Sequence, residues 1–159
     1  MRIVAIDGRS GSGKTALAAE VGAALHAPVV SMDHLYPGWD GLAAGIDGLV
    51  EHVLAPLCRG EVAAYRIWDW HRDRWGEPVE VPPAEVVIVE GCGSSLGPAG
   101  EYASLRVWLE APVEQRKARA LARDGETFRP HWERWAAQEE RLFGVDRTRE
   151  RADLVLTTG

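Results

Sequence analysis

The hydrophobic positions of this chain form short, uninterrupted apolar runs that alternate with amphipathic stretches. The runs Arg2–Asp7 (RIVAID) and Val86–Glu90 (VVIVE) are rich in isoleucine and valine and are each followed by glycine, which is typical of strands buried on both faces. Shorter runs of the same kind occur at Pro28–Met32, Leu105–Leu109 and Ala152–Leu156. We therefore predict five strands at these positions.

Helical periodicity occupies the intervals between these runs. From Gly45 to Leu57 the apolar residues recur at spacings of three and four, which indicates an amphipathic helix. Similar signals predict a helix from Gly13 to about His26, a charged helix after Pro112, and another from Pro130 to about Phe143. Because parallel strands need crossover connections, the alternation predicts an α/β fold, a five-stranded parallel sheet with helices on both faces.

The chain has 159 residues, about the size of one domain, and no repeat or linker divides it. We expect a single domain over residues 1–159. The segment 62–81 fits the alternation least well, because Trp68, Trp70 and Trp75 lie there among charged residues. We interpret it as an irregular excursion or a hairpin at the ligand-facing edge.

Charge and cysteine content narrow the function classes. The net charge of −6 argues against nucleic-acid binding, which depends on neutralising phosphates. Cys58 and Cys92 are far apart and have no metal-ligand spacing, so neither a disulfide framework nor a zinc site is indicated, and Cys92 reads as a small buried residue. The sequence has no signal-peptide pattern and no apolar stretch of membrane-spanning length, so we expect a cytoplasmic protein without a membrane partner.

The strongest motif is a phosphate-binding loop between the first strand and the first helix. Residues 8–15 read GRSGSGKT, a full match to GxxxxGK[ST]. Such a loop needs glycines because its backbone N–H groups must wrap a phosphate where a Cβ would obstruct them. In such loops the lysine, here Lys14, bridges the β- and γ-phosphates, and the hydroxyl, here Thr15, takes a position on Mg²⁺. The expected ATP-binding residues are Gly8, Ser10, Gly11, Ser12, Gly13, Lys14 and Thr15.

Other motifs separate the classes of protein that contain such loops. GTPases that select guanine use an NKxD-type motif, but this chain has no asparagine and no lysine placed for a related TKxD motif. Larger ATPase modules need a signature loop or a lid domain, for which 159 residues leave little room. A compact small-molecule kinase or a bare nucleotide-binding module remains.

Four further motifs follow the phosphate loop in a characteristic order: SMDHLYPGWD from Ser31, WDWHR from Trp68, VVIVEG from Val86 and RxxRxxxRD from Arg116. Together with GRSGSGKT, they resemble the uridine kinase branch of the P-loop kinases, which includes phosphoribulokinase-like and nicotinamide riboside kinase-like enzymes. The resemblance covers most of the chain. It implies a P-loop kinase fold, ATP and Mg²⁺ as cofactors, and a small-molecule phosphoryl acceptor.

The resemblance also implies residue roles. Asp33 would lie beside the acceptor hydroxyl and orient it or accept its proton. Glu90, at the end of a buried strand, would hold Mg²⁺ directly or through water. Arg116, Arg119 and Arg123 would belong to a lid at about residues 116–130 and clamp the transferring phosphates. The three arginines share one helical face, so a solvated basic surface is the alternative interpretation.

The acceptor side is expected to combine polar and aromatic residues. Asp69, His71 and Arg72 resemble the segment that contacts the nucleoside sugar in the family, although tryptophan replaces its tyrosine and the interval is shorter. Four tryptophans could form an aromatic wall for a flat substrate or fill the core of a small domain, namely Trp39, Trp68, Trp70 and Trp75. The expected substrate-binding residues are Asp33, Tyr36, Trp39, Trp68, Asp69, His71 and Arg72.

Two functions compete with a kinase that phosphorylates a nucleoside-like or other small alcohol, of which uridine is one candidate. A non-catalytic ATP-binding regulator has no need for Asp33, Glu90 and three lid arginines together, so their joint presence favours the enzyme. A nucleotide kinase with a phosphorylated acceptor needs additional arginines, and Arg66, Arg72 and Arg74 could serve. We expect a monomer or homodimer.

Overall fold

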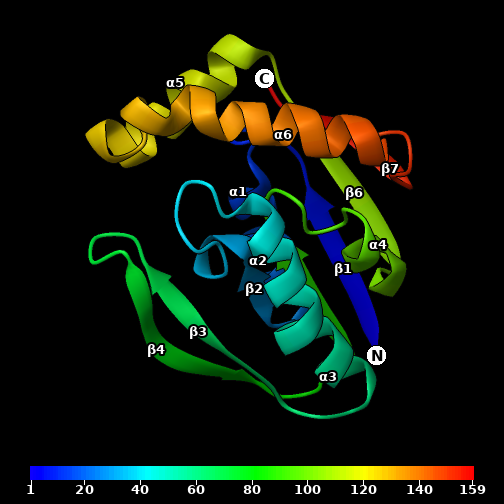
Figure 1. The fold of residues 1–159 in the computed structure, drawn as a ribbon. Coiled ribbons are helices and arrows are strands. Elements are labelled where there is room, and N and C mark those ends of the chain that lie inside the picture. The colour runs from blue at the N-terminus through cyan, green and yellow to red at the C-terminus, as the bar shows by residue number, and fades with distance from the viewer.

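The computed structural model describes residues 1–159 and contains a five-stranded parallel sheet in the order β2-β5-β1-β6-β7 (Figure 1). All five predicted strands are present: β1 (Arg2–Asp7), β2 (Val29–Ser31), β5 (Val86–Glu90), β6 (Leu105–Glu110) and β7 (Leu154–Thr157). β7 begins two residues later than the predicted start, because the N–H of Ala152 donates to Arg149 in the preceding turn.

The predicted helices are also present, with shifted ends. They are α1 (Lys14–Leu25), α2 (Leu42–Leu49), α3 (Ala55–Cys58), α5 (Val113–Asp124) and α6 (Trp132–Asp146). α2 and α3 are joined by a π-helical turn over Val50–Leu54, so the helix predicted over 45–57 spans Leu42–Cys58. This wider turn precedes Pro56, whose ring would collide with a carbonyl of the preceding turn in a regular α-helix. The short helix α4 (Pro98–Tyr102) was not predicted.

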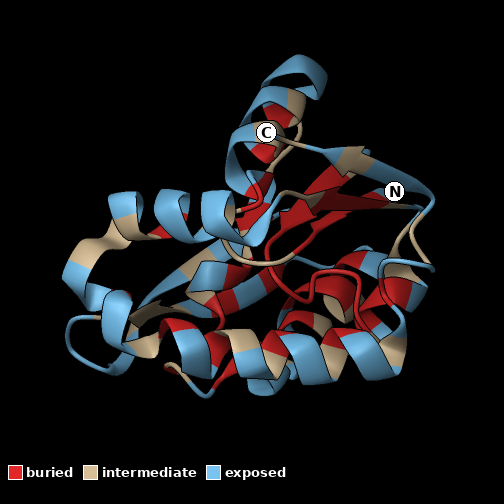
Figure 2. Ribbon diagram, turned by 90° about the horizontal axis from the view of Figure 1, so that it is seen from above, coloured by how far each residue is buried: buried red, intermediate tan, exposed pale blue.

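Side chains that alternate along the strands supply two cores on opposite faces of the sheet. Ile6 and Ile88 pack against Ala18 of α1. Ile3 and Val87 belong to the larger cluster on the other face, which α2, α3, α4 and α6 supply with most of its helical residues. Figure 2 shows the buried residues concentrated on the central strands and on the inner sides of the surrounding helices. The expected α/β architecture with helices on both faces is confirmed.

The segment 62–81 forms an antiparallel hairpin, one of the two forms expected for it. Its strands are β3 (Ala63–Asp69) and β4 (Arg74–Val81), which pair only with each other and extend beside the main sheet (Figure 1). The register changes between Arg66 and Trp68, which brings Trp68 opposite Trp75. No helix of the chain combines the length and the hydropathy needed to cross a bilayer.

Candidate active site

The carboxyl ends of β1, β5 and β2 lie at one edge of the sheet and carry the predicted site residues. β1 leads into the loop 8–13, β5 ends at Glu90, and β2 is followed by a 3₁₀ turn (Met32–His34) that contains Asp33. In open parallel sheets this edge is where ligands bind. The topology therefore brings three distant sequence motifs to one place.

The phosphate loop passes directly into α1 and is held from both sides. The backbone is left-handed at Gly11 (φ +79°) and Gly13 (φ +98°), conformations that favour glycine. A Cβ on Gly11 would collide with the backbone carbonyl of Arg116 in α5. Near the end of the chain, the Thr158 hydroxyl donates to the Ser12 carbonyl over 2.6 Å. α5 and the C-terminal segment thus fix the loop's shape.

Asp7 anchors the start of the loop to the segment after β5. The fully buried carboxylate accepts the N–H groups of Gly8 (2.7 Å), Gly93 (2.9 Å) and Ser95 (2.8 Å) and the Ser95 hydroxyl (2.9 Å). Burial raises the pKa of this carboxyl, and the hydrogen bonds from Ser95, Gly8 and Gly93 only partly oppose it. Asp7 was not predicted as a site residue, although its position at the end of a buried strand is a signal that the sequence contains.

Lys14 is buried and folds back onto its own loop. Its Nζ donates to the Arg9 carbonyl over 2.9 Å and to Ser12 Oγ over 3.5 Å. Burial disfavours the ammonium form, but the nearby acidic groups, Cys92 first and then Glu139 and Glu90, outweigh this effect, so the pKa of Lys14 is raised. The loop therefore holds a permanent positive charge where the motif predicts ATP phosphates.

The predicted Mg²⁺ residues are in contact. The Thr15 hydroxyl donates to Glu90 Oε2 over 3.2 Å, and the Ser31 hydroxyl donates to Glu90 Oε1 over 2.6 Å. This all-oxygen set suits Mg²⁺, which usually takes one or two protein oxygens and completes its shell with phosphates and waters. No group of three or more histidine, cysteine, aspartate or glutamate residues that could hold a metal ion is present, so phosphates and water would have to supply the remaining ligands. Ser31, in the strand before Asp33, was not predicted as a site residue.

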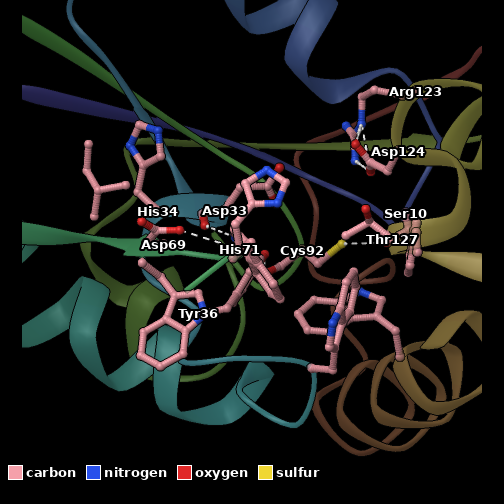
Figure 3. A pocket seen from close by; sticks show the side chains of 16 residues that line it. Ser10, Asp33, His34, Tyr36, Asp69, His71, Cys92, Arg123, Asp124 and Thr127 are labelled. Carbon is pink, nitrogen blue, oxygen red and sulfur yellow. Dashed lines mark hydrogen bonds and ion pairs between the residues drawn. The ribbon is translucent and has the colours of Figure 1, made fainter. Parts of the chain in front are cut away.

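Two cavities meet at this edge of the sheet. One of about 240 Å³, here called the phosphate cavity, is lined by the loop together with Lys14, Thr15 and Glu90. The other, of about 570 Å³ and here called the acceptor cavity, lies between the hairpin and the segments that follow β2 and α5 (Figure 3). Four residues line both cavities, namely Ser10, Asp33, Cys92 and Arg123.

Asp33 lies at this junction with its carboxylate available. Its backbone N–H is bonded to Ser31 Oγ (3.4 Å), and its carbonyl accepts the indole N–H of Trp70 (3.0 Å). The residue is exposed and lines both cavities, so the side chain can meet a ligand from either one. The main chain of Asp33 is thus fixed by neighbours while the side chain faces the space between the two sites.

The three predicted lid arginines lie in different surroundings. Arg123 lines both cavities and is held by Asp124 through hydrogen bonds of 2.8–3.1 Å; this pairing raises the pKa of its guanidinium. Arg119 lines the phosphate cavity and donates to the Gly11 carbonyl over 3.3 Å. Arg116 lines neither cavity and donates to Ser10 O (3.2 Å) and Ala111 O (3.1 Å). Arg116 therefore braces the loop in this structure, and the clamping role proposed for it stays a prediction.

Six of the seven predicted substrate-binding residues line the acceptor cavity: Asp33, Tyr36, Trp39, Trp68, Asp69 and His71. Arg72 does not; its guanidinium is exposed and lies 3.7 Å from Asp69 Oδ2. Two further aromatic residues line the cavity, Trp135 of α6, which was expected to pack, and Phe128 in the segment before α6, which was not predicted. Their roles are substrate contact or packing, and the sequence alone could not separate the two.

Trp39 connects the parts of this aromatic wall. Its ring stacks on His131 (centroids 4.7 Å apart) and Phe128 (5.1 Å), and it meets Trp70 of the hairpin turn at 4.6 Å. Among the lining residues, Trp68 Nε1 and His34 Nδ1 are shielded from solvent and have no hydrogen-bond partner. Unpaired buried nitrogens of this kind are uncommon in native proteins.

Glu139 is a further site residue that the sequence did not reveal. It lies on α6, is almost fully buried, and its Oε1 accepts the Ser10 N–H over 2.7 Å and the Cys92 thiol over 3.2 Å. Cys92, as expected, is small and buried, and burial raises its pKa to about 12. The contact joins α6 to the phosphate loop at the junction of the cavities.

The chain was compared with protein-family models, with curated protein sequences and with solved structures. No protein-family model and no curated protein sequence matches the chain. Among solved structures, a possible uridine kinase from Bacillus stearothermophilus is 19% identical, with a TM-score of 0.72 over 98% of this chain and 88% of that one. A candidate fructose transport system kinase from a Silicibacter species is 26% identical, with a TM-score of 0.61 over 98% and 89% of the two chains.

A third similar structure is a shikimate kinase from Acinetobacter baumannii in complex with shikimate. It is 18% identical, with a TM-score of 0.58 over 100% of this chain and 84% of that one. These structures are P-loop kinases that share the α/β architecture described above. The chain therefore has the P-loop kinase fold.

Proposed function

We propose that the protein transfers the γ-phosphoryl group of ATP to a hydroxyl group of a small organic molecule. One observation carries the proposal: the phosphate cavity and the acceptor cavity share Asp33 and Arg123, a carboxylate and a guanidinium, at their junction. Phosphoryl transfer needs this arrangement, because the attacking hydroxyl and the transferred group must meet in line between two binding sites.

The residues divide the chemistry between them. The loop N–H groups and Lys14 bind the ATP phosphates, and Thr15 with Glu90 would hold Mg²⁺, which when bound neutralises charge on the β- and γ-phosphates. Asp33 orients the acceptor hydroxyl. Its carboxylate takes the hydroxyl proton as the acceptor oxygen forms the new bond to the γ-phosphorus. The bond from phosphorus to the β–γ bridging oxygen breaks and ADP leaves. Arg123 stabilises the negative charge that develops during transfer.

The test is ADP formation by the purified protein with Mg²⁺ and a panel of nucleosides, vitamin precursors, sugars and small alcohols. We expect at least one acceptor to stimulate turnover. Asp33→Asn should bind ATP with unchanged affinity and lose acceptor-stimulated turnover by about 10²-fold or more. Lys14→Ala should lose ATP binding as well. Turnover that is unchanged in Asp33→Asn would contradict the role of this residue.

ATP binding without turnover on any acceptor would instead favour the non-catalytic module. The two measurements distinguish a kinase from a non-catalytic ATP-binding module, because calorimetry follows ATP binding and ADP release follows turnover. A matched control is Asp47→Asn, which removes an acidic charge on α2, outside both cavities. Its binding and turnover should equal those of the unmodified protein.

A further inference from the structure

The backbone of Ser10 in the phosphate loop is held by the two helices that flank the predicted lid. Its N–H donates to Glu139 Oε1 of α6 over 2.7 Å, and its carbonyl accepts from Arg116 of α5 over 3.2 Å. Ser10 is one of the predicted ATP-binding residues, but in this structure its N–H is already bonded to Glu139. The N–H groups that can bind phosphates are therefore those of the loop residues that follow Ser10.

Glu139 is a buried carboxylate that forms no ion pair. Only 1% of the residue is exposed, and its contacts are the Ser10 N–H and the Cys92 thiol, which lies 3.2 Å from Oε1. A neutral side chain could accept both hydrogen bonds at a lower cost, because burial of a carboxylate without a paired cation is unfavourable. The anchoring of the loop therefore does not by itself require a charge at this position.

The charge of Glu139 acts on the cations beside the loop. Burial lowers the pKa of the Arg116 guanidinium, and Glu139 is the largest of the charges that oppose this shift. Burial also disfavours the charged form of Lys14, whose pKa is nevertheless raised by Cys92 first and by Glu139 next. Glu139 thus contributes negative potential to the region where the loop is expected to receive phosphates.

The contacts of Glu139 lie at the junction of the two cavities. Ser10 and Cys92 both line the phosphate cavity and the acceptor cavity. Figure 3 shows their side chains beside each other, with Cys92 Sγ 3.7 Å from Ser10 Oγ. A phosphoryl group in transfer must lie between the two cavities. The Glu139 carboxylate is therefore placed behind the expected position of the γ-phosphate.

We propose that Glu139 is a positioning residue that lowers the preference of the site for ATP over ADP, an inference that rests on the kinase function proposed above. Its carboxylate keeps the Ser10 N–H directed toward α6, so that this donor does not bind the γ-phosphate. The same negative charge repels the γ-phosphate across the loop. ADP lacks this phosphate and is repelled less.

The test measures, by calorimetry with the full chain and Mg²⁺, the dissociation constants of ADP and of the ATP analogue with an imido group between the β- and γ-phosphorus atoms. Glu139→Gln keeps an oxygen that can accept the Ser10 N–H and removes the charge. We expect this variant to bind the analogue about fivefold more tightly and ADP at most about twofold more tightly. Lys14 keeps its charge in the variant, because other acidic groups also raise its pKa.

Two further variants separate charge from anchoring. Glu139→Asp keeps the charge on a shorter side chain, so it should lose thermal stability but retain the ratio of the two affinities found in the unmodified protein. Glu133→Gln removes the same charge from an exposed position of α6, where the carboxylate pairs with Lys117 at 3.2 Å. Solvent and salt screen a charge at this position, so both affinities should stay unchanged.

Each result decides the proposal. Unchanged or weaker binding of the analogue by Glu139→Gln overturns it, and so does an equal gain for ADP, because an anchoring role predicts no preference between the nucleotides. The same shift in Glu133→Gln also overturns it. Calorimetry does not depend on turnover, so acceptor-stimulated ADP formation with an unchanged affinity ratio in Glu139→Gln contradicts only this inference. The expected ratio without ADP formation from any acceptor contradicts the kinase function instead.

Discussion

The carboxylate of Glu139 accepts the backbone N–H of Ser10 over 2.7 Å, although 129 positions separate the two residues in the chain. The same oxygen accepts the Cys92 thiol. One buried side chain of α6 thus holds the phosphate loop against the segment after β5. The loop's position depends on a helix near the other end of the sequence.

Loss of Glu139 should destabilise the protein. Glu139→Ala leaves the half-buried Ser10 N–H without an acceptor and removes the carboxylate partner of the Cys92 thiol, and we expect the free energy of unfolding to fall by about 1–3 kcal/mol. Glu139→Gln keeps an acceptor oxygen and should lose less. Urea denaturation followed by circular dichroism measures both. Equal midpoints for Glu139→Ala and the unmodified protein would show that the contact contributes nothing to stability.

Two of the predicted lid arginines should differ in function: Arg123 should act on phosphoryl transfer and Arg116 on the position of the phosphate loop. Arg123→Ala removes a guanidinium from the junction of the cavities, so we expect kcat to fall by about 10²- to 10³-fold, the usual loss for one transition-state donor. Arg116→Ala removes bonds to Ser10 O and Ala111 O and should mainly lower thermal stability. Steady-state kinetics and thermal unfolding test the contrast; a larger loss of kcat in Arg116→Ala would reverse the assignment.

Gly11 should tolerate no side chain. Its backbone is left-handed (φ +79°), and an added Cβ would overlap the Arg116 carbonyl, so Gly11→Ala should shift the loop and abolish ATP binding. Gly60 is the matched control: it is also left-handed (φ +76°) but has open space around it. Gly60→Ala should carry only the backbone cost of about 1–3 kcal/mol and bind ATP normally. Calorimetric titration with ATP measures the difference, and equal affinities would contradict the steric argument.

The two cysteines should differ in reactivity. Burial raises the pKa of Cys92 to about 12, so its thiolate is scarce at pH 8, whereas Cys58 is exposed. Brief alkylation of the folded protein at pH 8, read by mass spectrometry, should label Cys58 alone, and denaturant should expose the second thiol. Labelling of Cys92 in the folded state would contradict its burial.

The same shift has a consequence for stability at alkaline pH. The folded state favours the neutral thiol of Cys92, so this contribution is complete below the ordinary pKa of about 9 and is lost as pH rises toward 12. We expect the urea midpoint to fall over this range by less in Cys92→Ala than in the unmodified protein. Equal slopes in the two proteins would exclude a contribution from this thiol.

The local sequence determined the inner strands of the sheet and the phosphate loop. Uninterrupted β-branched runs such as Val86–Glu90 are typical of strands buried on both faces, and GRSGSGKT between a strand and a helix is a full match to the phosphate-loop motif. The strands and the phosphate loop are each defined by consecutive residues, so the sequence predicts them without knowledge of the tertiary structure. The roles predicted for Asp33 and Glu90 came from the resemblance to the uridine kinase branch, and their positions at or just after the ends of strands agree with the edge where parallel sheets bind ligands.

Only the tertiary structure decided which side chains meet across the chain. The spacing of the three arginines at 116, 119 and 123 predicts one shared helical face and does not distinguish among them. In the structure α5 approaches Gly11, so Arg116 contacts the loop backbone and Arg123 lies at the junction of the two cavities. Glu139 has the pattern of any helical glutamate, and its role arises because α6 lies against the loop. Such contacts join residues more than 100 positions apart, and helical or strand periodicity carries no information about them.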